Sequence, residues 1–228
     1  SWTVGEWLIS YAGGFVRRGL PGELIHFISY KYSFSPILLV WLLSVFALLS
    51  LALLVLNFCK NLFDKSFLLS QLIILAPLSE DYLVRKDTLI VFLYGLCLLK
   101  LKFLYEGSKG KISCILGLNL FSIIAILSHE SYGIWALPSL IFILYLFERS
   151  NKRNRIKSFF LALFNLIPAL LSFLLCWVYK GDINQSQNIH QSWQALSHIL
   201  PSTGSLETFE PSGAIAVSYT HLRAHETN

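Results

Sequence analysis

Long apolar stretches without a charged residue constrain this chain most. Residues 37–57 run for 21 positions, and residues 158–179 for 22, with no Asp, Glu, Lys or Arg. A helix needs about 20 apolar residues to cross the roughly 30 Å hydrocarbon core of a bilayer. Only 14% of the 228 residues are charged, whereas soluble domains carry about 25%. The sequence predicts an all-α, polytopic transmembrane bundle. It excludes a soluble enzyme, a disordered protein and a nucleic-acid-binding domain, despite a net charge of +5.

Four further stretches bring the predicted number of spans to about six. Residues 112–128 and 131–147 each run for 17 uncharged positions, and residues 88–104 contain only two lysines. Residues 67–79 are the weakest candidate, because they number only 13 and include Pro77. This segment is predicted either to cross the membrane or to form a re-entrant segment, since non-helical backbone is tolerated there only when the protein shields it.

The distribution of Lys and Arg orients these spans. With six alternating spans, the loops 58–66, 100–111 and 148–157 share one side and carry eleven of the 18 Lys and Arg residues. The other side carries seven in a much greater length of chain. Because Lys and Arg are enriched in cytoplasmic loops, the first side is predicted to be cytoplasmic. Every unusual polar cluster then falls on the extracytoplasmic side.

The first polar cluster contains Arg17 and Arg18, which precede a predicted short interfacial helix near residues 21–31. Pro21 suits the first turn of that helix, and Glu23 suits its positive end. Two guanidinium groups beside a helix N-terminus are typical of a phosphate or pyrophosphate site. The alternative is that both arginines pair with lipid headgroups.

The second cluster places three acids and two bases in eight consecutive residues. Glu80 and Asp81 are candidates to bind a cation, a sugar hydroxyl or a proton, and Arg85 and Lys86 are candidates to bind a phosphate. Asp87 is predicted to cap the next helix. The alternative is a solvated loop whose charges pair with one another.

The third cluster, His129 and Glu130, interrupts an otherwise continuous apolar stretch. A charge exposed to hydrocarbon costs several kcal/mol, so both residues are expected at the outer rim or in a wet cavity. A carboxylate beside an imidazole offers proton transfer near neutral pH, and the alternative is a tight polar turn. The sequence contains no HExxH motif, P-loop or dinucleotide fingerprint, so no metal or cofactor is predicted.

These clusters resemble features of bacterial polytopic envelope-glycan proteins. The resemblance is to O-antigen or exopolysaccharide polymerases and to the GT-C class of lipid-linked glycosyltransferases. It lies in residues 13–20, in the residues 85–87 that open a helix, and in residues 129–130 on the outer side. It covers roughly residues 1–180 and rests on topology and charge. It implies a bacterial inner-membrane protein, in contact with membrane lipid, that transfers or polymerises sugars from a polyprenyl-diphosphate carrier on the extracytoplasmic face.

The residue patterns and the resemblance together imply two sets of site residues, which are expected to converge on one outer site. The substrate-binding candidates are Arg17, Arg18, Arg85, Lys86, Glu80 and Asp81. The acid–base candidates are Glu130, with His129 or Glu23 as alternatives. Two other functions remain open. One is a transporter or flippase, in which Glu130 and Asp87 bind protons or ions, and the other is a non-catalytic membrane subunit.

The domain organisation follows from the same patterns. Residues 1–180 are predicted to form the transmembrane domain, and residues 181–216 a polar extracytoplasmic loop. Residues 217–228 resemble translated sequencing-adaptor read-through and are predicted to be a non-native tail. The chain contains no methionine, so we expect it to be a fragment of a longer protein. The four cysteines lie in or beside apolar stretches with no CxxC pair, which predicts small core residues.

Overall fold

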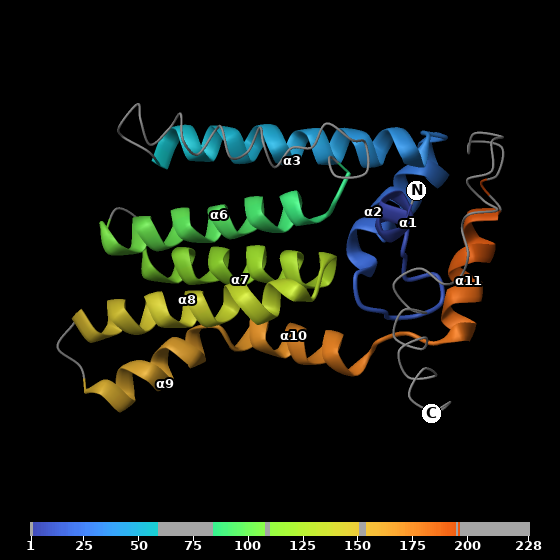
Figure 1. Ribbon diagram of the computed structural model, residues 1–228. Coiled ribbons are helices and arrows are strands. Elements are labelled where there is room, and N and C mark those ends of the chain that lie inside the picture. Colours follow the sequence, from blue (N-terminus) through green and yellow to red (C-terminus); the bar gives the residue numbers. More distant parts are fainter. Residues whose placement is uncertain (1, 59–83, 108–109, 151–153, 195, 197–228) are drawn as a thin grey trace, which may run out of the picture.

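A computed structural model describes residues 2–58, 84–107, 110–150, 154–194 and 196. Within these residues all the regular structure is helical (Figure 1). The elongated bundle contains α3 (Pro36–Phe58), α6 (Asp87–Tyr105), α7 (Lys111–Ser128), α8 (Ser131–Ser150), α9 (Arg155–Asn165) and α10 (Ile167–Val178). Three shorter helices gather at one end of this bundle: α1 (Trp2–Trp7), α2 (Gly19–Tyr32) and α11 (Ile183–Gln194). We call these three helices the cap.

The membrane prediction is confirmed by the length and composition of the bundle helices. Four of them, α3, α6, α7 and α8, are each long and apolar enough to cross a bilayer. The bent pair α9 and α10 makes a fifth span if the two helices are counted together. The remaining predicted span, residues 67–79, lies outside the described residues. The fold is therefore an all-α polytopic bundle.

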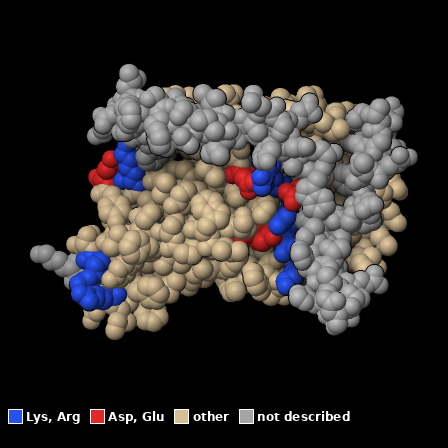
Figure 2. All heavy atoms as spheres, in the orientation of Figure 1, with Lys and Arg blue, Asp and Glu red and all other residues tan. Residues whose placement is uncertain are grey.

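The two ends of the bundle differ in charge. The cap lies where α6 and α8 begin and where α7 and α10 end (Figure 1). Basic and acidic side chains meet there. At the opposite end, on the left of Figure 2, Lys and Arg side chains also gather, some of them beside acidic side chains such as Glu106, which pairs with Lys102. Arg149, Arg155 and Lys157 belong to that basic end, because α8 finishes and α9 begins there. This separation is the one that the loop charges predicted.

Two apolar cores hold the described helices together. The first lies within the bundle, where small buried residues such as Ala125, Ala136 and Ala162 allow helices α6 to α10 to approach one another closely. The second joins the cap to the start of α3 and to Val84. Trp7 is buried in this second core, and its indole donates a hydrogen bond to the carbonyl of Val84.

The cap also contains part of the segment predicted to be an outer loop. The helix α11 begins at Ile183 and buries Ile189 and Trp193. The indole N–H of Trp193 donates to the carbonyl of Leu8 at 2.8 Å. The indole ring packs edge-on against the imidazole of His26, with 4.8 Å between the ring centroids. These contacts attach α11 to α1 and α2, so that the polar segment after α10 folds back onto the start of the chain.

The predicted span at residues 158–179 corresponds to two helices, α9 and α10, because the helix breaks within it. The axes of α9 and α10 differ by 63°. Pro168 has no N–H to donate to the preceding turn, which interrupts the helical hydrogen bonds. The side chain of Asn119 on α7 compensates: its Nδ2 donates to the carbonyl of Asn165 at 2.8 Å, and its Oδ1 accepts the N–H of Ala169 at 3.3 Å. The break is thus satisfied by protein groups within the bundle, as a lipid environment requires.

The charge difference between the two ends predicts the orientation of the protein. We expect alkaline phosphatase fused after Asn151 or after Gly107 to be inactive, because both junctions would lie in the cytoplasm. The same reporter fused after Ser131 should be active. Reporter activity normalised to the amount of each fusion is the measurement. High activity at Asn151 with low activity at Ser131 would reverse the orientation.

Candidate functional site

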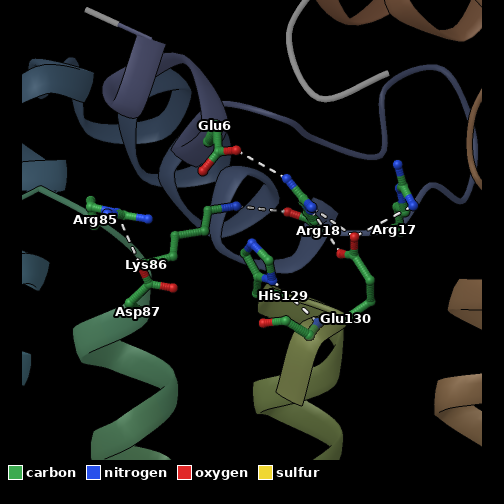
Figure 3. Close-up of polar contacts among 9 residues, drawn as sticks. Glu6, Arg17, Arg18, Arg85, Lys86, Asp87, His129 and Glu130 are labelled. Carbon is green, nitrogen blue, oxygen red and sulfur yellow. Dashed lines mark hydrogen bonds and ion pairs between the residues drawn. The ribbon is translucent and has the colours of Figure 1, made fainter. Parts of the chain in front are cut away.

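Arg18 connects the cap to the bundle through two carboxylates. Its Nε and Nη2 donate to the two carboxylate oxygens of Glu130, each at 2.7 Å. Its Nη1 donates to Oε1 of Glu6 on α1 at 3.0 Å (Figure 3). The Arg18 side chain is only 15% exposed and that of Glu130 only 12%. This two-pronged contact is the strong, planar geometry that arginine forms with carboxylates and phosphates.

Two further cations complete the arrangement. The Nη1 of Arg17 lies 3.4 Å from Oε1 of Glu130, so both arginines contact the same carboxylate. Lys86 approaches from the other side, and its Nζ donates to the backbone carbonyl of Arg18 at 3.1 Å. We call Glu6, Arg17, Arg18, Lys86 and Glu130 the ionic cluster. Members of all three predicted polar clusters meet in it.

The local backbone explains why these side chains converge. Glu130 lies in the short turn between α7 and α8, and Lys86 immediately precedes α6. Arg18 immediately precedes α2 and has a φ of 66°, in the left-handed region. A residue with a Cβ pays about 1–2 kcal/mol for that conformation. Such strain persists where surrounding contacts over-determine it, and here the contacts are the two carboxylates on the side chain and Lys86 on the carbonyl.

Glu130 is held as a carboxylate. Burial raises its pKa, but the hydrogen bonds and charge of Arg18 outweigh burial and lower the pKa from 4.5 to about 2. A group with so low a pKa is a poor proton acceptor near neutral pH. As long as the arginines hold it, Glu130 is therefore a fixed negative charge and does not serve as the general base that the sequence suggested.

His129 is held neutral. Burial lowers its pKa below 6.5, and the positive charge of Arg18 lowers it further. Its Nδ1 accepts the backbone N–H of Ser131 at 3.2 Å, at the start of α8. In a neutral imidazole with Nδ1 as acceptor, Nε2 carries the proton. The second candidate base is thus also occupied in this conformation.

The charge of Lys86 is sensitive to pH near neutrality. Its side chain is 2% exposed, and burial lowers its pKa from 10.5 to about 7. The carboxylate of Glu6 opposes this shift, and the charge of Arg18 adds to it. The two arginines and the two glutamates of the cluster balance in charge, so the protonation of Lys86 decides the net charge of the site.

The other predicted site residues lie elsewhere or have different roles. Arg85 is half exposed, at 52%, and pairs with Asp87 at 3.0 Å on the surface. Asp87 is the first residue of α6, so the N-cap position predicted for it belongs to Lys86, whose side chain makes no capping hydrogen bond. Glu23 lies beyond the first turn of α2, and its Oε2 accepts the N–H of Tyr11 at 2.9 Å, so it fixes the preceding loop. Glu80 and Asp81 lie outside the described residues.

The glycines around Arg17 and Arg18 serve packing between protein segments. A Cβ at Gly19 would collide with the ring of Tyr11, and one at Gly22 would collide with the backbone carbonyl of Ile9. A Cβ at Gly13 would meet the backbone of Gln185, which precedes the middle of α11. The space beside these three glycines is therefore filled by the protein.

Glu6 is the member of the ionic cluster that sequence reasoning missed. It is one acid in a short helix, and its 3.0 Å contact with Arg18 joins residues 12 positions apart through a loop. The available signal was the position of Glu6 on the same side of the membrane as two arginines that need counter-charges. Its carboxylate is 20% exposed.

The ionic cluster predicts a pH dependence of stability. Because the folded pKa of Glu130 is lower than its ordinary value of 4.5, its charged form favours folding. This contribution is complete above about pH 4.5 and is lost as pH falls towards 2. We expect the melting temperature of detergent-solubilised protein to fall more steeply over this range than that of Glu130→Gln. Glu106→Gln, at the basic end, is the matched control and should follow the unmodified protein. Parallel curves for all three proteins would contradict the prediction.

Comparison with known proteins places the chain in a family. Its sequence matches the family described as "Uncharacterised membrane protein Rv1490" over residues 2–196. No curated protein and no solved structure matches the chain. The matched region includes the cap through Leu196, the bundle and every member of the ionic cluster. This polytopic membrane protein therefore belongs to the Rv1490 family of membrane proteins.

Proposed function

We propose that the protein binds a lipid-linked diphosphate at the ionic cluster and transfers or polymerises the attached sugar on the extracytoplasmic face of a bacterial inner membrane. The observation that carries this proposal is the contact of both Arg17 and Arg18 with Glu130. Two guanidinium groups directed at one anionic group form the geometry that holds a phosphate. The carboxylate of Glu130 occupies the position that a phosphate would take.

Ligand binding would then be an exchange of anions. A diphosphate that takes the two arginines displaces Glu130 from them. The pKa of Glu130, which the arginine holds at about 2, rises once that contact is lost and a second anion lies nearby. Released in this way, Glu130 becomes able to accept a proton. The fixed carboxylate of the resting site and the general base of the reaction are thus the same group at two stages.

The proposed transfer step uses this released carboxylate. The acceptor hydroxyl oxygen attacks the anomeric carbon of the lipid-linked sugar, and its proton passes to Glu130. The bond from the anomeric carbon to the diphosphate oxygen breaks, and its electron pair leaves with the lipid diphosphate. Arg17 and Arg18 stabilise the charge that develops on the leaving group.

A transporter is the second candidate, and the broken helix favours it. Discontinuous helices commonly form the substrate and ion sites of secondary transporters, and α9 and α10 meet at 63°. The backbone groups beside this break are nevertheless occupied by Asn119, which leaves them unavailable to an ion. Counterflow of a lipid-linked sugar in proteoliposomes, in the absence of an acceptor, would support the transporter over the transferase.

Binding of a short polyprenyl diphosphate tests the site directly. We expect farnesyl diphosphate, but not farnesol, to raise the melting temperature of the detergent-purified protein. Arg17→Lys should weaken binding about tenfold, because an ammonium loses the two-pronged geometry, and Arg17→Glu should abolish it. Lys31→Glu, an exposed charge reversal on α2, is the matched control and should bind normally. Equal binding by all three variants would exclude this site.

Glu130→Gln separates binding from transfer. The amide removes a competing carboxylate, so we expect farnesyl diphosphate to bind this variant more tightly than the unmodified protein. The amide cannot accept the acceptor proton, so the transfer rate should fall at least about 100-fold. Cells that carry the variant should accumulate lipid-linked sugar, measured by mass spectrometry of lipid extracts. Normal lipid-linked sugar and normal surface glycan would remove Glu130 from the mechanism.

A further inference from the structure

The ionic cluster contains a buried amine that the proposed exchange of anions does not use. Lys86 immediately precedes α6, and its Nζ lies 3.1 Å from the carbonyl oxygen of Arg18. Among the described residues this carbonyl is its one hydrogen-bond acceptor, and the ring of Trp7 lies 6.0 Å from the Nζ. An ammonium has three donors, so the resting site provides only part of what a charged lysine requires. Its surroundings favour the neutral amine.

The charges around Lys86 come from every element that meets there. Glu6 on α1 is negative, Arg18 before α2 is positive, and Glu130 between α7 and α8 is negative. His129 in the same turn is neutral, since its pKa is lowered by burial. Arg85 and Asp87, the sequence neighbours of Lys86, pair with each other at 3.0 Å. With the amine neutral, the cluster's two carboxylates balance its two guanidinium groups.

A bound diphosphate would upset this balance. It adds at least two negative charges. The two arginines can pair with these charges only if they release Glu130. The site then holds more negative than positive charge next to the Lys86 amine, and an opposite charge within a few ångströms favours the protonated form. The fully buried position of Lys86 strengthens this effect, because little water screens it.

We propose that Lys86 is a proton-accepting third cation of the anion site, neutral in the resting protein and protonated when a phosphate-bearing ligand binds to Arg17 and Arg18. This inference rests on the proposed function and adds to it a stoichiometry: one proton enters the site with each anion. It also specifies the ligand class, because a multiply charged phosphate leaves a larger excess of negative charge beside Lys86 than a singly charged anion does, and therefore drives the uptake more strongly.

The test is the pH dependence of binding. The dissociation constant of farnesyl diphosphate should rise by up to about tenfold per pH unit between pH 7.5 and 9, the slope for uptake of one proton. Three groups at the described site are not expected to titrate over this range. The ordinary second pKa of a phosphate monoester is about 6, the pKa of His129 is lowered from 6.5 by burial, and the pKa of Tyr11 is raised to about 12 by burial. Calorimetry in buffers of different ionisation enthalpy should count about one proton per ligand.

Two variants assign the proton to Lys86. Lys86→Met removes the titrating group, so its affinity should be low and independent of pH. Lys86→Arg keeps a permanent charge, so its affinity for farnesyl diphosphate should be high and independent of pH. The melting temperature of this variant reports whether the site accommodates the larger side chain. Lys31→Met, at an exposed lysine on α2, is the matched control and should keep the full pH dependence.

The outcomes separate this inference from the proposed function. Tight binding that does not change between pH 7.5 and 9 would overturn proton uptake and leave the anion site standing. The same pH dependence in Lys86→Met as in the unmodified protein would assign the proton to another group and also overturn the inference. Failure of farnesyl diphosphate to bind at any pH would overturn both.

Discussion

The two-pronged contact between Arg18 and Glu130 is the interaction on which the arrangement of the site depends. Arg18 joins the turn between α7 and α8 to Glu6 on α1, and its carbonyl receives Lys86 from the start of α6. Removal of one member of such a buried set leaves the others uncompensated, at a cost of about 3–5 kcal/mol. The same contact acts on the charge states of the site, because the guanidinium keeps Glu130 ionised and adds to the burial that lowers the pKa of His129.

The bundle could be predicted from the sequence because its physical basis is local. A helix that crosses a bilayer must be predominantly apolar, and α3, α6, α7 and α8 each coincide closely with a predicted span. The break between α9 and α10 could not be predicted in the same way. A proline such as Pro168 can interrupt a helix, but the stability of the break depends on Asn119, which lies 46 positions from Asn165.

The candidate site was predictable in part, because charged residues are rare in this chain and each cluster therefore stood out. The sequence pointed to Arg17, Arg18, Lys86, His129 and Glu130, but not to their pairings, which join residues as far as 112 positions apart. Pairing reverses the expected chemistry: a carboxylate beside an imidazole suggested a base, and the guanidinium that reaches it makes it a fixed anion. Membership of the Rv1490 family identifies the chain as a membrane protein. Any mechanism must in addition explain the ion pairs of the ionic cluster.

The amide of Asn119 has a consequence for the way this chain enters the membrane. The hydrogen-bonding groups exposed at the break after Asn165 are completed by a residue on α7, which is translated before α9 and α10. A segment with open backbone groups is poorly suited to partition into lipid by itself. We therefore expect residues 155–178 to insert more favourably beside α7 than as an independent anchor, because α7 supplies the groups that complete the break.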